Sequence, residues 1–130
     1  MVKTYDNDNG ARMKLLIVDD NAAMRHLMRR LTCDLMERIE ECADGAEALA
    51  VYERHNFGAD DWVLMDFEMP GLDGIRATEQ LCARHPEARV LIVTRYDDEA
   101  LRRRLLAGGA YGFIHKDNLL ELRTVFDPAH

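Results

Sequence analysis

Five residues of types that can bind a metal ion or a phosphoryl group each stand at the end of a short apolar segment. They are Asp19, Asp20, Asp66, Thr94 and Lys116. Carboxylates that lie close together repel one another, and they stay ionised at neutral pH only if a cation lies among them. Because all the expected ligands are oxygen atoms, Mg²⁺ with retained waters is the best fit. A lysine and a hydroxyl opposite that ion would complete a site for a transferring phosphoryl group, with a carboxylate as nucleophile.

The segments that precede these residues, 14–18, 62–65, 90–93 and 111–114, are short and mostly apolar, like buried strands, and residues 39–43 are a weaker candidate for a further strand. Such strands are typical of parallel sheets that are covered on both faces. Between them, apolar residues recur every three or four positions, which predicts helices around residues 24–35, 46–55, 75–84, 97–107 and 118–126. We interpret the stripe in the first helix as core, namely Met24, Leu27, Met28 and Leu31. The alternation predicts an α/β fold with a doubly wound, five-stranded parallel sheet and five helices.

The carboxyl ends of parallel strands lie at one edge of the sheet, where ligands of such folds bind. We therefore expect the five polar residues to meet at that edge. Taken singly, Asp19 or Asp20 is more simply explained as a helix cap or a turn residue. The joint placement of five such residues at strand ends is what favours a functional site.

The composition limits the classes of partner. The net charge is −7, and the one dense basic cluster, Arg102–Arg104, is interpreted as a solvated helix face, so we expect no direct binding of nucleic acid. No apolar run reaches the roughly 20 residues of a membrane span, and the polar residues 1–12 lack the apolar segment of a signal peptide. Three cysteines without a C-x-x-C spacing favour reduced thiols and a cytoplasmic location.

Four segments resemble the receiver domain of the response-regulator family, and the similarity extends from Lys14 to about Phe126. The segments are Leu16–Asn21, Asp66–Gly74, Val93–Thr94 and Gly108–Lys116. The resemblance implies a flavodoxin-like sheet with the strand order 2-1-3-4-5. The polar residues 1–12 are interpreted as a flexible N-terminal tail, which leaves residues 13–127 as the receiver domain.

The resemblance further implies a role for each acidic residue. Asp66 would accept the phosphoryl group and also bind Mg²⁺. Asp20 would bind the ion directly and Asp19 mainly through water, while the backbone carbonyl of Glu68 would complete the protein ligands. The donor would be a phosphohistidine on a sensor histidine kinase or on a histidine phosphotransfer protein.

The same resemblance implies that the domain is a switch. Thr94 would bond a phosphoryl oxygen and move toward it, Phe113 would follow with a change of rotamer, and Lys116 would pair with another oxygen. The changed surface, around the fourth helix, the last two strands and the fifth helix, would bind a downstream output domain or protein. Whether the domain forms a homodimer stays open, and Tyr96 and Tyr111 are candidates for the border of the partner surface.

Three residues depart from the usual pattern of the family. Arg95 stands where a small residue is common, and its side chain would either shade Asp66 or offer a further phosphate contact. Glu68 adds a negative charge two residues after the acceptor, and we hypothesise that it slows hydrolysis by disfavouring the approach of water. Asp117 stands where many receivers have proline after a cis bond, so Lys116 is held either by a strained cis bond or by a different loop.

Two other functions stay open at this point. A degenerate receiver would act only as a binding or dimerisation module, an alternative that Arg95 and Asp117 support and the complete set of site residues opposes. A phosphohydrolase with an aspartate nucleophile would use Glu68 as its general acid. The loop at Met69–Pro70 and the lack of a cap insertion disfavour that enzyme.

Overall fold

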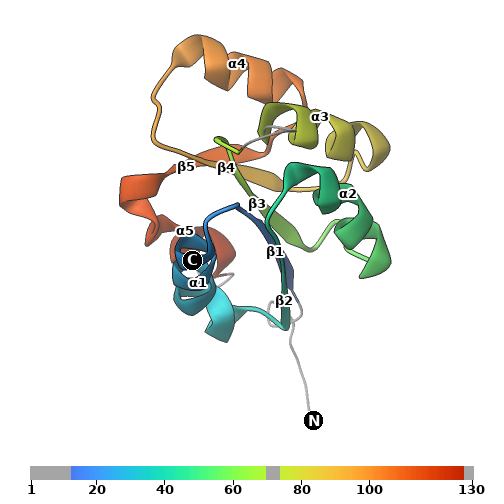
Figure 1. Ribbon diagram of the computed structural model, residues 1–130, viewed down its shortest axis with the longest axis vertical. Coiled ribbons are helices and arrows are strands. Elements are labelled where there is room, and N and C mark those ends of the chain that lie inside the picture. Colours follow the sequence, from blue (N-terminus) through green and yellow to red (C-terminus); the bar gives the residue numbers. More distant parts are fainter. Residues whose placement is uncertain (1–12, 70–73, 128–130) are drawn as a thin grey trace.

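The chain folds around a sheet of five parallel strands (Figure 1). The computed structural model describes residues 13–69 and 74–127. The strands are β1 (Lys14–Val18), β2 (Arg38–Cys42), β3 (Trp62–Asp66), β4 (Val90–Thr94) and β5 (Gly112–His115). They pair in the order β2-β1-β3-β4-β5. The predicted sheet and its strand order are confirmed, with β2 and β5 displaced by one residue from the predicted ranges.

Helices cover both faces of the sheet: α1 (Ala22–Thr32), α2 (Gly45–Arg54), α3 (Gly74–Arg84), α4 (Glu99–Ala107) and α5 (Glu121–Phe126). Figure 1 shows α1 and α5 together on one face, and α2 and α3 on the other with α4 above them. The predicted ends of the first and fifth helices were wrong. The 3-10 turn η2 (Cys33–Leu35) follows α1, where the amide of Met36 donates to the carbonyl of Cys33, three residues back, and the 3-10 turn η3 (Lys116–Asn118) precedes α5.

Side-chain caps fix where three of the helices begin. Asn21, Asp44 and Asp98 each accept a hydrogen bond from a backbone amide in the first turn of α1, α2 and α4. These caps follow β1, β2 and β4, so they hold the loops at the carboxyl edge of the sheet. The loop after β1 carries two of the predicted site residues.

The sheet separates two hydrophobic clusters, one beneath each layer of helices. Along β1, Leu16 and Val18 belong to the cluster beneath α2, α3 and α4, whereas Leu15 and Ile17 belong to the cluster beneath α1 and α5. Strands β3 and β4 are buried along their whole length. This two-sided burial holds the ends of the central strands in fixed positions, which is what a site built on those ends requires.

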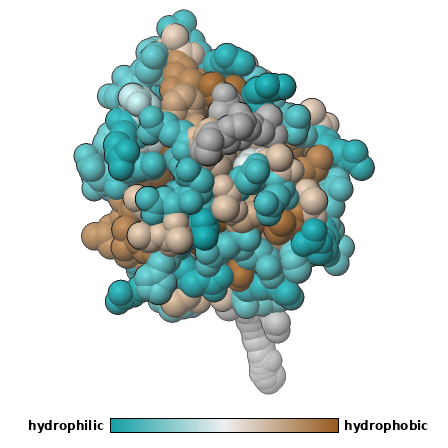
Figure 2. Space-filling model, in the orientation of Figure 1, coloured by the Kyte–Doolittle hydropathy of each residue, from teal (hydrophilic) through white to brown (hydrophobic). Residues whose placement is uncertain are grey.

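The stripe of α1 is only partly core, so one part of its prediction was wrong. Met28 is fully buried and Met24 and Leu31 pack against the core, but Leu27 is 44% exposed. The apolar stripe of α1 is wider than the part of that helix which the sheet and the short α5 cover. Leu27 lines an open pocket of about 400 Å³ together with Leu120, which is 69% exposed. Figure 2 shows hydrophobic side chains at the left-hand edge, where Figure 1 draws the segment between β5 and α5.

Some expectations fall on residues outside the described ranges. The expected flexible tail, residues 1–12, lies there, and so do residues 70–73 of the segment Asp66–Gly74. Within residues 13–69 and 74–127, no helix combines the length and the apolar composition needed to cross a membrane.

Candidate functional site

The carboxylates of Asp19, Asp20 and Asp66 meet at the carboxyl edge of the sheet. Each offers one oxygen atom, and the three oxygens lie within 4.8 Å of one another. Asp19 and Asp66 are buried, whereas Asp20 is exposed to solvent. Two neighbouring strands, β1 and β3, thus bring together residues that are more than forty positions apart in the chain.

Asp19 carries a buried oxygen that lacks a hydrogen-bond partner among the described residues. Its Oδ1 atom accepts a hydrogen bond from the amide of Asn21 at 2.8 Å, while its Oδ2 atom is buried and unpaired. Burial raises the pKa of Asp19 to about 6, and the charges of Asp66 and Asp20 add to that effect against the lowering by Asn21 and Lys116. A buried, unpaired carboxylate oxygen beside two more carboxylates fits a hard divalent cation, since all the donors are oxygen.

Asp66 forms a buried ion pair with Lys116. The Nζ atom of Lys116 lies 3.0 Å from Oδ1 of Asp66, and the two side chains are only 9% and 3% exposed. The amide of Glu68 also donates to the same oxygen, at 3.3 Å. Removal of one partner from such a pair leaves an uncompensated buried charge, so the lysine and the aspartate depend on each other.

Lys116 is held by a tight turn with trans peptide bonds. Every peptide bond among residues 13–69 and 74–127 is trans, the one between Lys116 and Asp117 included. The turn η3 is capped by His115, whose Nδ1 atom accepts a hydrogen bond from the amide of Asp117 at 3.0 Å. The Nε2 atom of His115 lies 3.1 Å from the carbonyl oxygen of Arg95. One neutral tautomer, protonated at Nε2, satisfies both contacts, so the second of the two expected arrangements is found: a different loop places the lysine.

Thr94 ends β4 beside this pair and is 5% exposed. Its hydroxyl oxygen accepts a hydrogen bond from the amide of Tyr96 at 2.9 Å. The strand register sets Val93 opposite Asp66 and Thr94 opposite His115, so the hydroxyl stands between the ends of β3 and β5. The sheet therefore carries all five predicted residues on the ends of adjacent strands.

Three exposed side chains, Glu68, Arg95 and Tyr96, form a polar rim beside the buried residues. The hydroxyl of Tyr96 donates to Oε2 of Glu68 at 2.7 Å, and that bond raises the pKa of Tyr96. The ring of Tyr96 meets the ring of Phe67 edge-on, with centroids 5.8 Å apart. Arg95 brings its Nη1 atom to 3.9 Å from Oε1 of Glu68. The sequence suggested these residues one by one, but it gave no sign that they contact one another.

Two aromatic residues of the predicted switch surface lie apart from this rim. Phe113 is partly buried against the cluster beneath α4, and the guanidinium group of Arg102 lies 5.0 Å from its ring centre. Tyr111 is 59% exposed and meets the ring of Trp62 edge-on at 4.9 Å. Their expected roles in switching and in partner binding stay predictions.

Gly74, the first residue of α3, approaches the acceptor strand too closely for any side chain. A Cβ atom there would collide with the carbonyl oxygen of Asp66 and lie 2.9 Å from the Cα atom of Phe67. Its amide donates to the carbonyl of Phe67 at 3.3 Å. The sequence predicted a helix only from residue 75, because nothing in the local pattern shows that α3 begins against β3.

The fold and the site define a class: a parallel α/β domain with an acidic cluster and a buried lysine at the carboxyl edge of its sheet. The sequence model described as "Response regulator receiver domain" matches residues 15–126. The oxygen regulatory protein NreC of Staphylococcus haemolyticus is 37% identical over 123 residues, which cover 88% of this chain and 55% of that protein. The chain belongs to the response regulator receiver domain family, and it is a receiver domain of two-component signalling.

Solved structures support the same family. A two-component response regulator of the LuxR family from Aurantimonas has a TM-score of 0.79 and 28% identity, with 89% of this chain and 83% of that chain covered. The CheX-CheY-BeF3-Mg²⁺ complex from Borrelia burgdorferi matches with a TM-score of 0.73 and 31% identity, over 88% of each chain. The chain spans about half the length of the curated relatives that it matches, 46% in one case and 55% in others.

Proposed function

We propose that this receiver domain accepts a phosphoryl group on Asp66 in a reaction that depends on Mg²⁺. One observation carries the proposal: the buried ion pair between Lys116 and Asp66, 3.0 Å long, borders the cluster of three carboxylate oxygens. A cation on one side of the acceptor and an ammonium group on the other are what a transferring phosphoryl group requires, because its equatorial oxygens carry the negative charge.

Asp19, Asp20 and Asp66 are the side chains that would hold Mg²⁺, and the backbone carbonyl of Glu68 is proposed as the further protein ligand. The unpaired Oδ2 atom of Asp19 supports this assignment. When bound, the ion would neutralise charge on the phosphoryl oxygens. The structure of a related complex named with BeF3 and Mg²⁺ also supports the proposal.

The transfer itself needs a nucleophile and a charge partner from this chain. Oδ1 of Asp66 carries the contacts to Lys116 and to the amide of Glu68, so we assign Oδ2 as the nucleophile. A bond forms between Oδ2 and phosphorus as the bond from phosphorus to the donor's imidazole nitrogen breaks. The electron pair of that bond stays on the imidazole, which takes up a proton from solvent. Lys116 then pairs with a phosphoryl oxygen.

Thr94 and Phe113 would change position in response to the negative charge of the phosphoryl group. The hydroxyl of Thr94 accepts a hydrogen bond from the amide of Tyr96, and among the described residues no acceptor takes its own hydrogen, which could therefore be donated to a phosphoryl oxygen. Movement of Thr94 toward that oxygen would leave room for a new rotamer of Phe113, which is only partly buried. The surface around α4, β4, β5 and α5 would change as a result.

The partners follow from this chemistry. We assign the donor to a sensor histidine kinase or a histidine phosphotransfer protein, and the changed surface to a downstream output domain or protein, or to a second copy of the chain. The boundaries of the receiver domain at residues 13 and 127, and the cytoplasmic location, are parts of the same proposal.

Intact mass after incubation with MgCl₂ and acetyl phosphate tests the proposal. We expect the parent chain to gain one phosphoryl group and Asp66→Asn to gain none. Labelling of both would refute Asp66 as the acceptor. No labelling of either would favour the degenerate receiver, unless Arg95→Ala restores labelling, in which case the arginine shades the acceptor.

A phosphohydrolase finds less support in the geometry. It needs the carboxyl of Glu68 as a proton donor near Asp66, but that carboxyl accepts a hydrogen bond from Tyr96 and lies near Arg95 at the exposed rim. Release of inorganic phosphate from a phosphomonoester with turnover, measured beside the mass experiment, would revive that alternative.

A further inference from the structure

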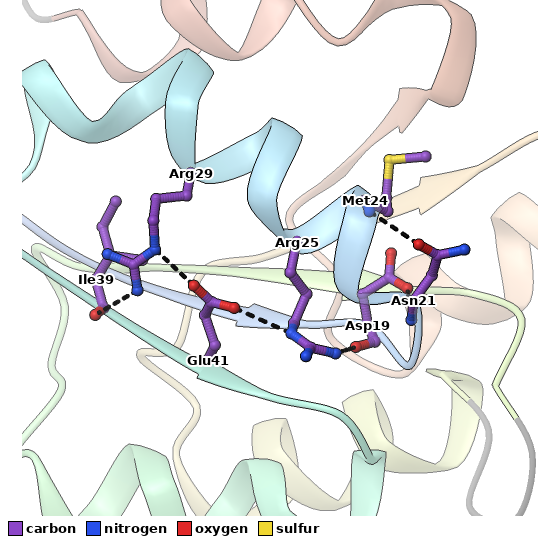
Figure 3. A network of polar contacts seen from close by, with 7 residues as sticks. All are labelled: Asp19, Asn21, Met24, Arg25, Arg29, Ile39 and Glu41. Atoms are coloured by element: carbon purple, nitrogen blue, oxygen red, sulfur yellow. Dashed lines mark hydrogen bonds and ion pairs between the residues drawn. The ribbon is translucent and has the colours of Figure 1, made fainter.

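A network of ionic contacts and hydrogen bonds connects β2 and α1 to Asp19, the residue that follows β1 (Figure 3). Glu41 on β2 accepts from two arginines of α1: its Oε1 atom lies 3.0 Å from Nε of Arg25, and its Oε2 atom lies 2.5 Å from Nε of Arg29. Arg29 also donates to the carbonyl of Ile39 at 3.3 Å. The two arginines lie side by side on one face of α1, because they are four residues apart.

Only one of these arginines reaches the site. Nη1 of Arg25 donates to the backbone carbonyl oxygen of Asp19 at 2.7 Å (Figure 3). The amide of Asp19 donates to the carbonyl of Cys42 at 3.1 Å, and its Oδ1 atom accepts from Asn21 at 2.8 Å. The backbone of Asp19 is thereby held from α1 and from β2. Of the two carboxylate oxygens of Asp19, Oδ2 has no partner among the described residues.

The contacts of Arg25 are sheltered enough to hold their geometry. Its side chain is 20% exposed and that of Glu41 is 27% exposed, whereas Arg29 is 41% exposed. Burial acts to raise the pKa of Glu41, but the hydrogen bonds from Arg29 and Arg25 outweigh it and hold that pKa below its ordinary value. A guanidinium group fits this place because its planar fork donates in two directions at once, to Glu41 and to Asp19.

We propose that Arg25, anchored by Glu41, is a positioning residue for the metal site, which fixes the backbone of Asp19 so that its free oxygen faces Asp20 and Asp66. The inference rests on the proposed function, because it concerns the Mg²⁺ that Asp66 needs. Arg25 touches neither the ion nor the phosphoryl group in this scheme. It acts through Asp19, as residues that orient metal ligands commonly do.

The positive charge of Arg25 and its proposed positioning role predict opposite effects of its removal on the affinity for Mg²⁺. A positive group near the acidic cluster repels a divalent cation, so by charge alone its removal would tighten the binding of Mg²⁺. If Arg25 positions Asp19, its removal weakens that binding instead. Arg29→Met is the matched control, since it removes one arginine from the same carboxylate, Glu41, but has no contact with Asp19 among the described residues.

The experiment is a titration of metal-free protein with MgCl₂, followed by the NMR shifts of the backbone amides near Asp20 and Glu68. We expect Arg25→Met to raise the Kd for Mg²⁺ by roughly tenfold, while Arg29→Met leaves it near the parent value. Arg25→Lys keeps the charge but lacks the fork, so its Kd should lie between those of the parent and of Arg25→Met. The same spectra show whether each variant is folded.

The outcomes separate this inference from the proposed function. A parent chain that does not bind Mg²⁺ would overturn the proposed metal site itself. If the parent chain binds Mg²⁺ and the Arg25→Met variant has an equal or lower Kd, the positioning role is overturned and the proposed function is unaffected. If Arg25→Met does not fold, Arg25→Lys decides: an unchanged Kd rejects the role and a weakened one supports it.

Discussion

The buried carboxylate of Asp19 is expected to destabilise the metal-free fold at neutral pH. It is 1% exposed, and burial raises its pKa from an ordinary value of 3.8 to about 6. The native state therefore binds a proton at Asp19 more tightly than the unfolded chain does. Asp19→Asn should stabilise the metal-free protein, since the amide keeps an oxygen that can accept the hydrogen bond from Asn21 and carries no charge.

The direction of the stability change, and the pH range in which it occurs, follow from that pKa. Well below pH 3.8 the carboxyl is protonated in both states and favours neither. As the pH rises from 3.8 to about 6 the unfolded chain gives up this proton first, so the stability of the parent falls. Above that window the loss is constant, at about 3 kcal/mol for a pKa difference of this size. The gain from Asp19→Asn should thus stay below about 1 kcal/mol at pH 4 and reach about 3 kcal/mol above pH 7.

Urea unfolding in EDTA between pH 4 and pH 8 measures this difference. Taking the parent and the variant at the same pH cancels the titration of the other carboxyl groups. Asp60→Asn is the matched control, because Asp60 is exposed and lies outside the acidic cluster, so its substitution should change stability little. Added Mg²⁺ should stabilise the parent and narrow its gap to Asp19→Asn, since a ligand that binds only the folded state raises its stability.

Two results would refute the reasoning. A gain of the same size at pH 4 and pH 8 would show that packing, and not charge, is responsible. A loss of stability at pH 8 would show that the ionised carboxylate is satisfied in the metal-free fold, against the unpaired state of its Oδ2 atom.

Three further predictions concern the rim, the fold and the thiols. Glu68→Asn should speed the loss of phosphate from the phosphorylated chain, followed by intact mass over time, and an unchanged rate would reject the hypothesis that Glu68 hinders water. Gly109→Ala should lower the unfolding free energy by about 1–3 kcal/mol, because its φ is +109° and a Cβ would lie 2.5 Å from a side chain of α3. Gly58→Ala is the control and should leave the unfolding free energy unchanged, because a Cβ there would have nothing within 4 Å. Equal urea midpoints for the two variants would contradict the reasoning. Iodoacetamide at pH 8 should alkylate the exposed Cys33 well before the buried Cys42, whose pKa burial raises to about 11; equal rates by peptide mass would show that the burial is transient.

The sequence predicted the fold well because the apolar periodicity reports burial directly. Strands β3 and β4 read as short continuous apolar runs and are buried on both faces in the structure. The site followed from the fold, since parallel strands deliver their carboxyl ends to one edge and the five polar residues stand there. The same periodicity overestimated the core at Leu27, because a stripe on a helix does not show how wide the neighbouring surface is.

The contacts that refine the site were beyond the sequence for a different reason. Arg25 and Glu41 are sixteen residues apart, on a helix and on an edge strand, and no local pattern pairs them. His115 was not singled out, yet it caps the turn that places Lys116. The first contact depends on how α1 packs beside β2 and the second on the backbone turn of η3, and propensity and periodicity encode neither.

The rim changes how the charge of Glu68 should be understood. From the sequence, Glu68 is a lone negative charge two residues after the acceptor, and it would act on water by repulsion. In the structure its carboxylate accepts a hydrogen bond from Tyr96 and lies 3.9 Å from Arg95, at side chains that are 43% and 63% exposed. Solvent screens exposed charges of this kind, and Arg95 lies beside the carboxylate, so repulsion by Glu68 should act only weakly on an approaching water. An effect of Glu68 on hydrolysis would then come from the bond that ties Tyr96 across the ends of β3 and β4, and Tyr96→Phe, which keeps the carboxylate but loses that bond, should speed hydrolysis about as much as Glu68→Asn does.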